Sequence, residues 1–164
     1  LLKRLENFNY VDFDIPETLV LASYYLSKSF SNKKNFFYGE EEFSNKIIKE
    51  FDLIFLPPWE IDKVAKDSIN LAINKNSLGE MDPNTAKNFI DNIHRTSKYF
   101  FSMNHEYYRN IFQNGQKSLI NREYNLDGKF KQLIRYPDLG HLTYERNKID
   151  SGVNTFFYIY EKNQ

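Results

Sequence analysis

Asp14 is the first residue whose position suits binding chemistry. It lies near the end of a strand-like run over residues 10–15, and Pro16 then turns the chain into a helix. In dinucleotide-type α/β folds, ligands lie at the carboxyl ends of the strands, where an acidic residue can accept hydrogen bonds from both hydroxyls of a ribose. Asp14 is placed for that role. The alternative is that its carboxylate only caps the helix from Glu17 onward, because Asp is common at helix starts.

A polar loop follows the strand-like run at residues 69–73. It carries two amides, a hydroxyl and a carboxylate on Asn74, Asn76, Ser77 and Glu80. In a doubly wound sheet this loop lies at the switch point, where such groups suit a ligand with many hydroxyls and little apolar surface. The alternative is an ordinary Asn/Ser loop with Glu80 at the start of a helix.

Two histidines could take a proton from an acceptor hydroxyl. His105 follows Asn104 at a strand end, and His141 lies in a loop before the last strand. Because an unperturbed imidazole titrates close to neutral pH, either could act as a general base. A structural role for each is the alternative, and the sequence does not choose between them. His94 lies beside the apolar face of a helix and is interpreted as a boundary residue.

Strands and helices must bring these candidate residues together. Along the chain, strand-like segments alternate with helix-like ones. The alternation predicts a mostly parallel sheet covered by helices. Asp82-Pro83 is a helix-start signature, in which a carboxylate caps the helix and Pro takes its first position. Strands are predicted over residues 10–15, 35–38, 51–56, 69–73, 98–103, 130–136 and 154–160, and helices over residues 17–30, after Asp82-Pro83 and over residues 105–112, with the end of another at residues 1–8.

Three segments carry a resemblance to a known family. Phe13-Asp14-Ile15-Pro16-Glu17 is similar to the "Asp-Leu-Pro" segment after the second strand of many S-adenosylmethionine-dependent O-methyltransferases. Residues 71–81, LAINKNSLGEM, resemble the segment after the fourth strand of the bacterial sugar O-methyltransferase family. Residues 100–104, FFSMN, resemble that family's fifth strand, which ends in Asn. The order and spacing of all three agree, and the similarity covers roughly residues 10 to 162.

The resemblance implies a class I methyltransferase. The expected fold is an α/β, three-layer Rossmann-like sandwich, with a mostly parallel sheet and an antiparallel last strand. The implied cofactor is S-adenosyl-L-methionine, and the implied acceptor is a hydroxyl of a sugar or glycan precursor in polysaccharide biosynthesis. A non-catalytic Rossmann-like scaffold subunit and a nucleotide-sugar oxidoreductase are the alternatives. The second is weakened because Tyr107 and Tyr108 are not followed by Lys at the fourth place.

The candidate site residues fall into three groups. Expected cofactor-binding residues are Asp14, Ile15, Pro58, Trp59 and Asn74. Expected substrate-binding residues are Asn76, Ser77, Glu80 and Asn104. Candidates for the catalytic base are Glu80, His105 and His141.

The sequence differs from this family in lacking the Gly-rich turn that binds the cofactor. A Gly-rich turn between the first strand and first helix lets the backbone approach the cofactor. None of the 6 glycines forms that pattern, and the first of them, Gly39, already lies past Asp14. The first strand and its Gly-rich loop are therefore expected upstream of Leu1. Residues 1–164 are interpreted as a single methyltransferase domain that is incomplete at its N-terminus.

The run Leu56-Pro57-Pro58-Trp59 resembles the Asp/Asn-Pro-Pro-aromatic motif of enzymes that methylate amino groups of nucleic-acid bases. The first residue of that motif must accept a hydrogen bond from the target amine, and Leu56 cannot. The run therefore either ends a strand with Trp59 filling a gap, or packs near the adenine of the cofactor.

The overall composition limits which classes of partner, metal site and membrane segment the protein can have. The 22 basic and 22 acidic residues balance, which argues against nucleic acid as the main partner. There is no Cys, which excludes disulfides and thiolate metal sites and fits a cytoplasmic protein. The three histidines lack metal-ligand spacing, so no metal is expected, and no apolar run is long enough to span a bilayer. The oligomeric state is left open.

Overall fold

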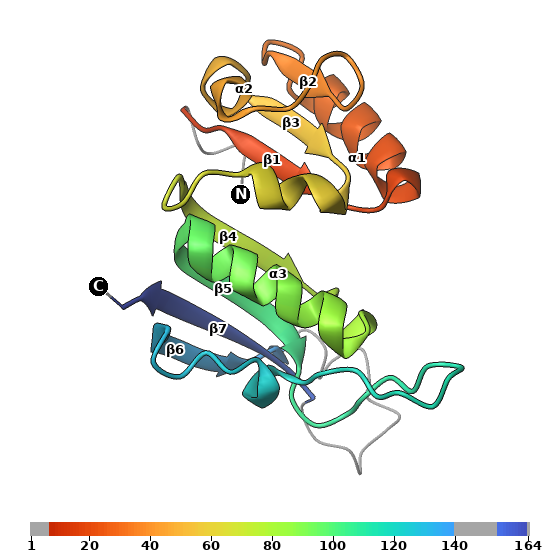
Figure 1. Cartoon of the computed structure of the whole chain (residues 1–164), viewed down its shortest axis with the longest axis vertical. Helices are drawn as coiled ribbons and strands as arrows, with labels where there is room; N and C mark the ends of the chain where they lie inside the picture. The colour runs from red at the N-terminus through yellow and green to blue at the C-terminus, as the bar shows by residue number, and fades with distance from the viewer. Residues whose placement is uncertain (1–6, 140–153, 164) are drawn as a thin grey trace. The chain divides into compact units, whose positions relative to one another are not determined.

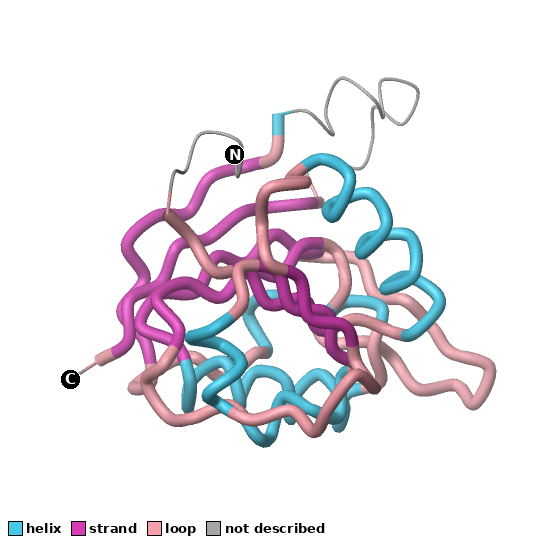
Figure 2. The backbone as a smooth tube through the Cα atoms, turned by 90° about the horizontal axis from the view of Figure 1, so that it is seen from above, coloured by secondary structure: helices cyan, strands magenta, loops and turns pink. Residues whose placement is uncertain are grey.

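The structure is a computed structural model that describes residues 7–139 and 154–163 (Figure 1). The chain divides into a first unit that ends at Ala65 and a second unit that begins at Lys66. Strands and helices alternate along it, as the tube in Figure 2 shows.

The first unit is built on a parallel sheet of three strands. β3 lies in the middle, and its neighbours β1 and β2 both run parallel to it. All four residues of β3 are buried, and Leu19 of α1 packs on Leu53 and Phe55 of that strand. The elements are β1 (Tyr10–Phe13), α1 (Pro16–Ser29), β2 (Asn35–Phe37), α2 (Asn45–Glu50), β3 (Leu53–Leu56) and the 3-10 helix η2 (Pro58–Lys63).

The second unit holds a four-stranded sheet in the order β4-β5-β7-β6. β4 and β5 are parallel, whereas β7 runs antiparallel to both of its neighbours. The elements are β4 (Ile69–Lys75), the 3-10 helix η3 (Leu78–Glu80), α3 (Pro83–Thr96), β5 (Ser97–His105), the 3-10 helix η4 (Asn121–Glu123), β6 (Phe130–Pro137) and β7 (Thr155–Lys162).

Helix α3 forms for the reasons that its sequence indicates. Asp82 caps it, since Oδ1 accepts hydrogen bonds from Asn84 N at 3.0 Å and Thr85 N at 3.1 Å. Pro83 then occupies the first helical position. The residues spaced for one helix face, Ala86, Phe89, Ile90 and Ile93, are all buried. The predicted start and apolar face of α3 are both confirmed.

The predicted α/β Rossmann-like fold class is confirmed, including the mostly parallel pairing and the antiparallel last strand. All seven predicted strands are present. The short helix α2 was not predicted, because it buries only Ile47 and so leaves no periodic apolar signal. The helix end predicted at residues 1–8 falls mostly outside the described residues.

The helix predicted over residues 105–112 is wrong. Asn154, far along the chain, satisfies the backbone donors that would open it. Glu106 N donates to Asn154 O at 2.7 Å, and Tyr107 N and Tyr108 N donate to its side-chain Oδ1 at 3.0 Å each. These contacts hold the segment as a turn that leads into an irregular loop.

No helix within residues 7–139 and 154–163 combines the length and the apolar character that a membrane crossing requires.

Candidate functional site

Asp14 follows the carboxyl end of β1, and its carboxylate does not cap α1. The N-cap residue of that helix is Ile15, and no side chain makes a capping hydrogen bond. Oδ1 of Asp14 instead accepts from Ile15 N at 2.7 Å. Its Oδ2 has no partner among the described residues, so this oxygen remains available to a ligand. The ribose-binding role of Asp14 stays a prediction.

Asp12, two residues earlier on β1, was missed from sequence. Burial raises its pKa to about 6, and the nearby charge of Asp14 adds to the effect. A carboxylate with a raised pKa is destabilised in the folded protein relative to the unfolded chain. The alternation of apolar and acidic residues at positions 11–14 offered a weak signal, because it puts the carboxylates of Asp12 and Asp14 on the same face of the chain.

We expect Asp12→Asn to stabilise the protein at pH 8 and to change little at pH 4. Between the ordinary pKa near 4 and the folded value near 6, the folded state binds the extra proton, so stability falls as pH rises through this window. The gain above pH 6 should be about 3 kcal/mol in the free energy of unfolding, measured with urea.

Asp52→Asn is the matched control for this experiment. A hydrogen bond from Lys34 N at 2.8 Å holds the pKa of Asp52 below its usual range. Its loss should therefore destabilise the protein at neutral pH. Equal pH profiles for the two variants would contradict the assignment of Asp12.

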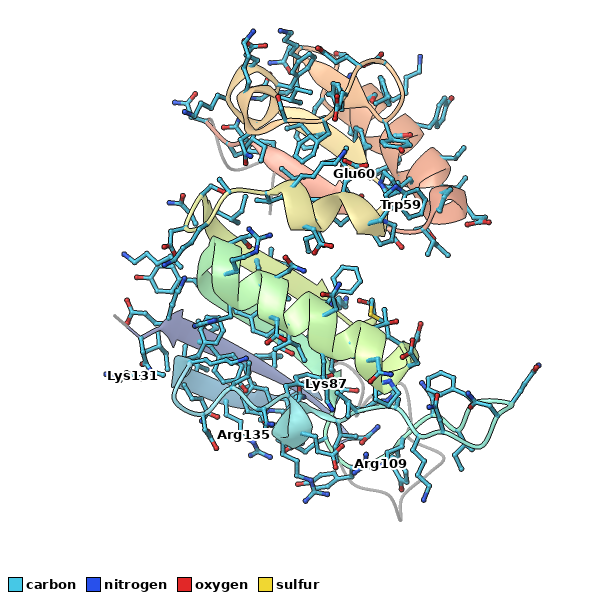
Figure 3. The ribbon with its side chains drawn as sticks, in the orientation of Figure 1. Trp59, Glu60, Lys87, Arg109, Lys131 and Arg135 are labelled. Carbon is cyan, nitrogen blue, oxygen red and sulfur yellow. The ribbon has the colours of Figure 1, made fainter. Side chains whose placement is uncertain are left out.

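Pro58 and Trp59 lie at the start of η2 in the same unit as Asp14 (Figure 3). The Trp59 side chain does not fill a gap, since the residue is 58% exposed. Its ring meets that of Tyr38 edge-on, with centroids 6.2 Å apart. Beside it, the buried Glu60 pairs with Lys63 at 2.9 Å. The exposed indole face is what a planar ligand needs, whereas the contact with adenine stays a prediction.

Three predicted site residues meet at the carboxyl ends of β4 and β5. Asn104 Nδ2 donates to Asn74 Oδ1 at 3.1 Å. Asn74 Nδ2 donates in turn to Ser77 Oγ at 2.6 Å, and Leu78 N donates back to Asn74 Oδ1 at 3.2 Å. The loop after β4 is therefore tied to the end of β5 through side-chain amides.

A second layer of polar side chains stands behind this network and was missed from sequence. Ser102 Oγ donates to Asn121 Oδ1 at 3.1 Å, and Asn121 Nδ2 donates to the carbonyl of Asn104 at 2.9 Å. Asn104 Nδ2 also donates to Ser102 Oγ at 3.0 Å. Asn104 is fully buried, and its Oδ1 has no hydrogen-bond partner among the described residues. Asn104 thus orients Asn74 and lies behind the half-buried loop residues.

One further loop residue, Gly79, lies close to His105. Asn76 takes a left-handed conformation with φ of 54°, and Asn110 Nδ2 donates to the carbonyl of Gly79 at 2.8 Å. Gly79 lies against the His105 ring, whose Nδ1 is buried without a partner among the described residues. Glu80 is exposed. Substrate and base roles for these residues stay predictions, and His141 lies outside the described residues.

An ion pair between the buried Glu106 and the exposed Arg135 holds the segment after β5, and it was also missed from sequence. Tyr158 OH donates to Glu106 Oε2 at 2.7 Å, and Arg135 donates to Glu106 Oε1 at 3.2 Å and to Tyr158 OH at 2.9 Å. Burial, together with the hydrogen bond to Glu106, raises the pKa of Tyr158 to about 12. The cluster joins β5, β6 and β7 at one edge of the sheet; Figure 3 labels Arg135.

Within the described residues, no three His, Cys, Asp or Glu side chains come together as metal ligands.

No protein-family model and no curated protein matches the chain. Among solved structures, the PH0226 protein from Pyrococcus horikoshii OT3 is similar at a TM-score of 0.57 and 11% identity, covering 96% of this chain and 73% of that one. This likeness shows a shared fold. Two other solved structures are more distant. An S-adenosylmethionine-dependent methyltransferase from Mesorhizobium loti has a TM-score of 0.41 and 12% identity, covering 69% of this chain and 71% of that one. PigF with SAH has a TM-score of 0.44 and 10% identity, covering 93% of this chain and 43% of that one.

Proposed function

We propose that this chain transfers a methyl group from S-adenosylmethionine to a hydroxyl of a sugar or glycan precursor. One observation carries the proposal. Asn74, Ser77 and Asn104 belong to segments that resemble the sugar O-methyltransferase family, and hydrogen bonds join them where β4 and β5 end. Carboxyl ends of parallel strands are where α/β folds bind their ligands, so the resemblance and the geometry support the same edge of the sheet.

The first unit supplies groups that fit the cofactor. Asp14 carries a carboxylate oxygen with no partner in the described residues, which suits the ribose hydroxyls. Ile15 and Trp59 are exposed apolar side chains of the kind that cover an adenine. Pro58 fixes the start of η2 beside Trp59.

When bound, S-adenosylmethionine would supply an activated methyl group for the acceptor oxygen. The residues of the chain bind and orient the partners, because the cofactor already carries the reactive group. Asn76 and Ser77 hold acceptor hydroxyls through an amide and a hydroxyl. Asn104 keeps Asn74 in place from behind.

A general base near the acceptor removes its proton. The side chains of Glu80 and His105 are both available for this role in the second unit, and His141 is the third candidate. Glu80 is an exposed residue of η3. His105 already presents a buried, unpartnered Nδ1 in the described structure.

We expect the full-length protein to bind S-adenosylmethionine or its demethylated product in titration calorimetry. NAD is the control ligand, because an acid after a strand also holds the ribose of that cofactor. If NAD is the one ligand that gives a heat of binding, the protein belongs to the oxidoreductase class instead. A folded protein that binds none of the three would be a scaffold.

A further inference from the structure

Helix α1 carries apolar side chains on two opposite faces. Leu19 and Leu26 lie on its inner face and pack against the core of the first unit at β3. A surface helix normally has one apolar stripe that faces the core and polar residues on the opposite side. The opposite, outer face of α1 departs from this pattern, and the departure calls for a partner.

The outer face of α1 consists of six exposed residues at helical spacing: Glu17, Val20, Leu21, Tyr24, Tyr25 and Lys28. Its four central residues are aliphatic or aromatic, and they are 66 to 73% exposed. Residues three and four positions apart are neighbours on a helix surface, so these four form one continuous patch. Because each tyrosine can bury about 150–250 Å², the patch reaches the few hundred Å² that mark an interaction site.

The two charged residues at the ends of the outer face indicate what covers it. Glu17 lies in the first turn of α1 and Lys28 in the last turn. Neither forms an ion pair within residues 7–139 and 154–163. At the rise of an α-helix they are about 16 Å apart along the axis, which is too far for them to pair with each other.

An antiparallel copy of the same helix complements this pattern. A twofold axis level with the middle of α1, between positions 22 and 23, brings Glu17 of each copy to Lys28 of the other copy. The same axis sets Leu21 opposite Tyr24, and the other two apolar residues of the face also meet across it. A parallel pair would instead bring like charges together at both ends. We propose that the outer face of α1 packs against the outer face of a second copy of the chain, with the two helices antiparallel.

A lipid surface is the alternative partner for an exposed apolar helix face. Helices that lie on membranes are rich in Lys and Arg beside the apolar face. Lys28 is the one basic residue of α1, and the acidic Glu17 is exposed on the same face. The charges therefore favour a second copy over an anionic membrane.

Sedimentation equilibrium of the full-length protein tests the proposal, because it measures the mass of the particle in solution. A dimer is expected at micromolar concentration. A monomer throughout this range would overturn the proposal. That outcome holds if another segment of the same chain covers the outer face, and it holds equally if the monomer binds phosphatidylglycerol vesicles.

Leu21→Ala tests whether the outer face forms the interface. It should raise the dissociation constant of the dimer at least about tenfold, because an apolar side chain is lost from both copies. Ile111→Ala is the matched control, since it removes an aliphatic side chain that is 70% exposed, against 73% for Leu21, from the second unit. Equal dissociation constants for the two variants would overturn the proposal.

Charge reversal tests the antiparallel arrangement itself. Lys28→Glu places like charges at both ends of the pair and should weaken the dimer about tenfold. Adding Glu17→Lys to this variant restores opposite charges between the copies and should restore the dimer. The two positions are too far apart to pair within one copy, so such a rescue requires an antiparallel partner. A double variant that dimerises as weakly as Lys28→Glu alone would overturn the proposal.

Discussion

Replacing Asp14 with Ala is expected to weaken binding of S-adenosylmethionine by roughly 2 to 4 kcal/mol, a factor of about 30 to 700 in the dissociation constant. The reason is the loss of two hydrogen bonds from ribose hydroxyls to a carboxylate. The free energy of unfolding should stay nearly unchanged, because Ile15 is the N-cap of α1 and the Asp14 side chain does not cap that helix. Calorimetry and urea unfolding measure the two quantities separately.

Glu17→Ala is the control for this change. It removes an exposed carboxylate from the first turn of α1, a few residues beyond the strand end. Its effect on cofactor affinity should be small. If Asp14→Ala lowers stability and leaves affinity unaltered, the carboxylate serves the fold, and the cofactor site must lie elsewhere.

Asn104→Asp is expected to lower the free energy of unfolding at pH 8 by about 3 kcal/mol and to lower methyl transfer by at least about tenfold. The substitution replaces the donor Nδ2 with an oxygen that faces Asn74 Oδ1 and Ser102 Oγ in a fully buried position. Two acceptors then confront each other, and the loop that carries Asn74 and Ser77 loses its tie to β5.

This prediction has a pH signature that a simple packing defect lacks. The introduced carboxyl is buried, so its folded pKa should lie above its unfolded pKa. Stability is then lost as pH rises through that window and recovered below it, where the protonated group donates to Asn74 again. Asn114→Asp, the same change on an exposed turn where Nδ2 donates to Gln116 Oε1 at 3.0 Å, should show no such recovery. A pH-independent loss in Asn104→Asp would contradict the network.

The strand ends could be predicted because they depend on local pattern. The run at residues 51–56 is apolar throughout, and β3 is the fully buried strand of its sheet. Asn74 and Asn104 stand at strand ends, where polarity returns after apolar residues. Parallel pairing of β4 with β5 then brings the two amides together, with Asn74 opposite Ser102 in the register. The helix predicted after β5 was wrong because the prediction used only the local pattern. The backbone N–H groups of that segment donate instead to Asn154, which lies far along the chain.

Alternating strand and helix patterns, the cap at Asp82 and the polar residues at strand ends all depend on neighbouring positions in the sequence. The class of fold follows from these local patterns, and so does the prediction of the edge that binds ligands. The side-chain contacts behind that edge of the sheet do not follow from local patterns. Asn121 contacts Asn104, and Glu106 contacts Tyr158. These contacts join positions far apart in the chain. Their geometry depends on how side chains pack across the sheet, and no local periodicity encodes that.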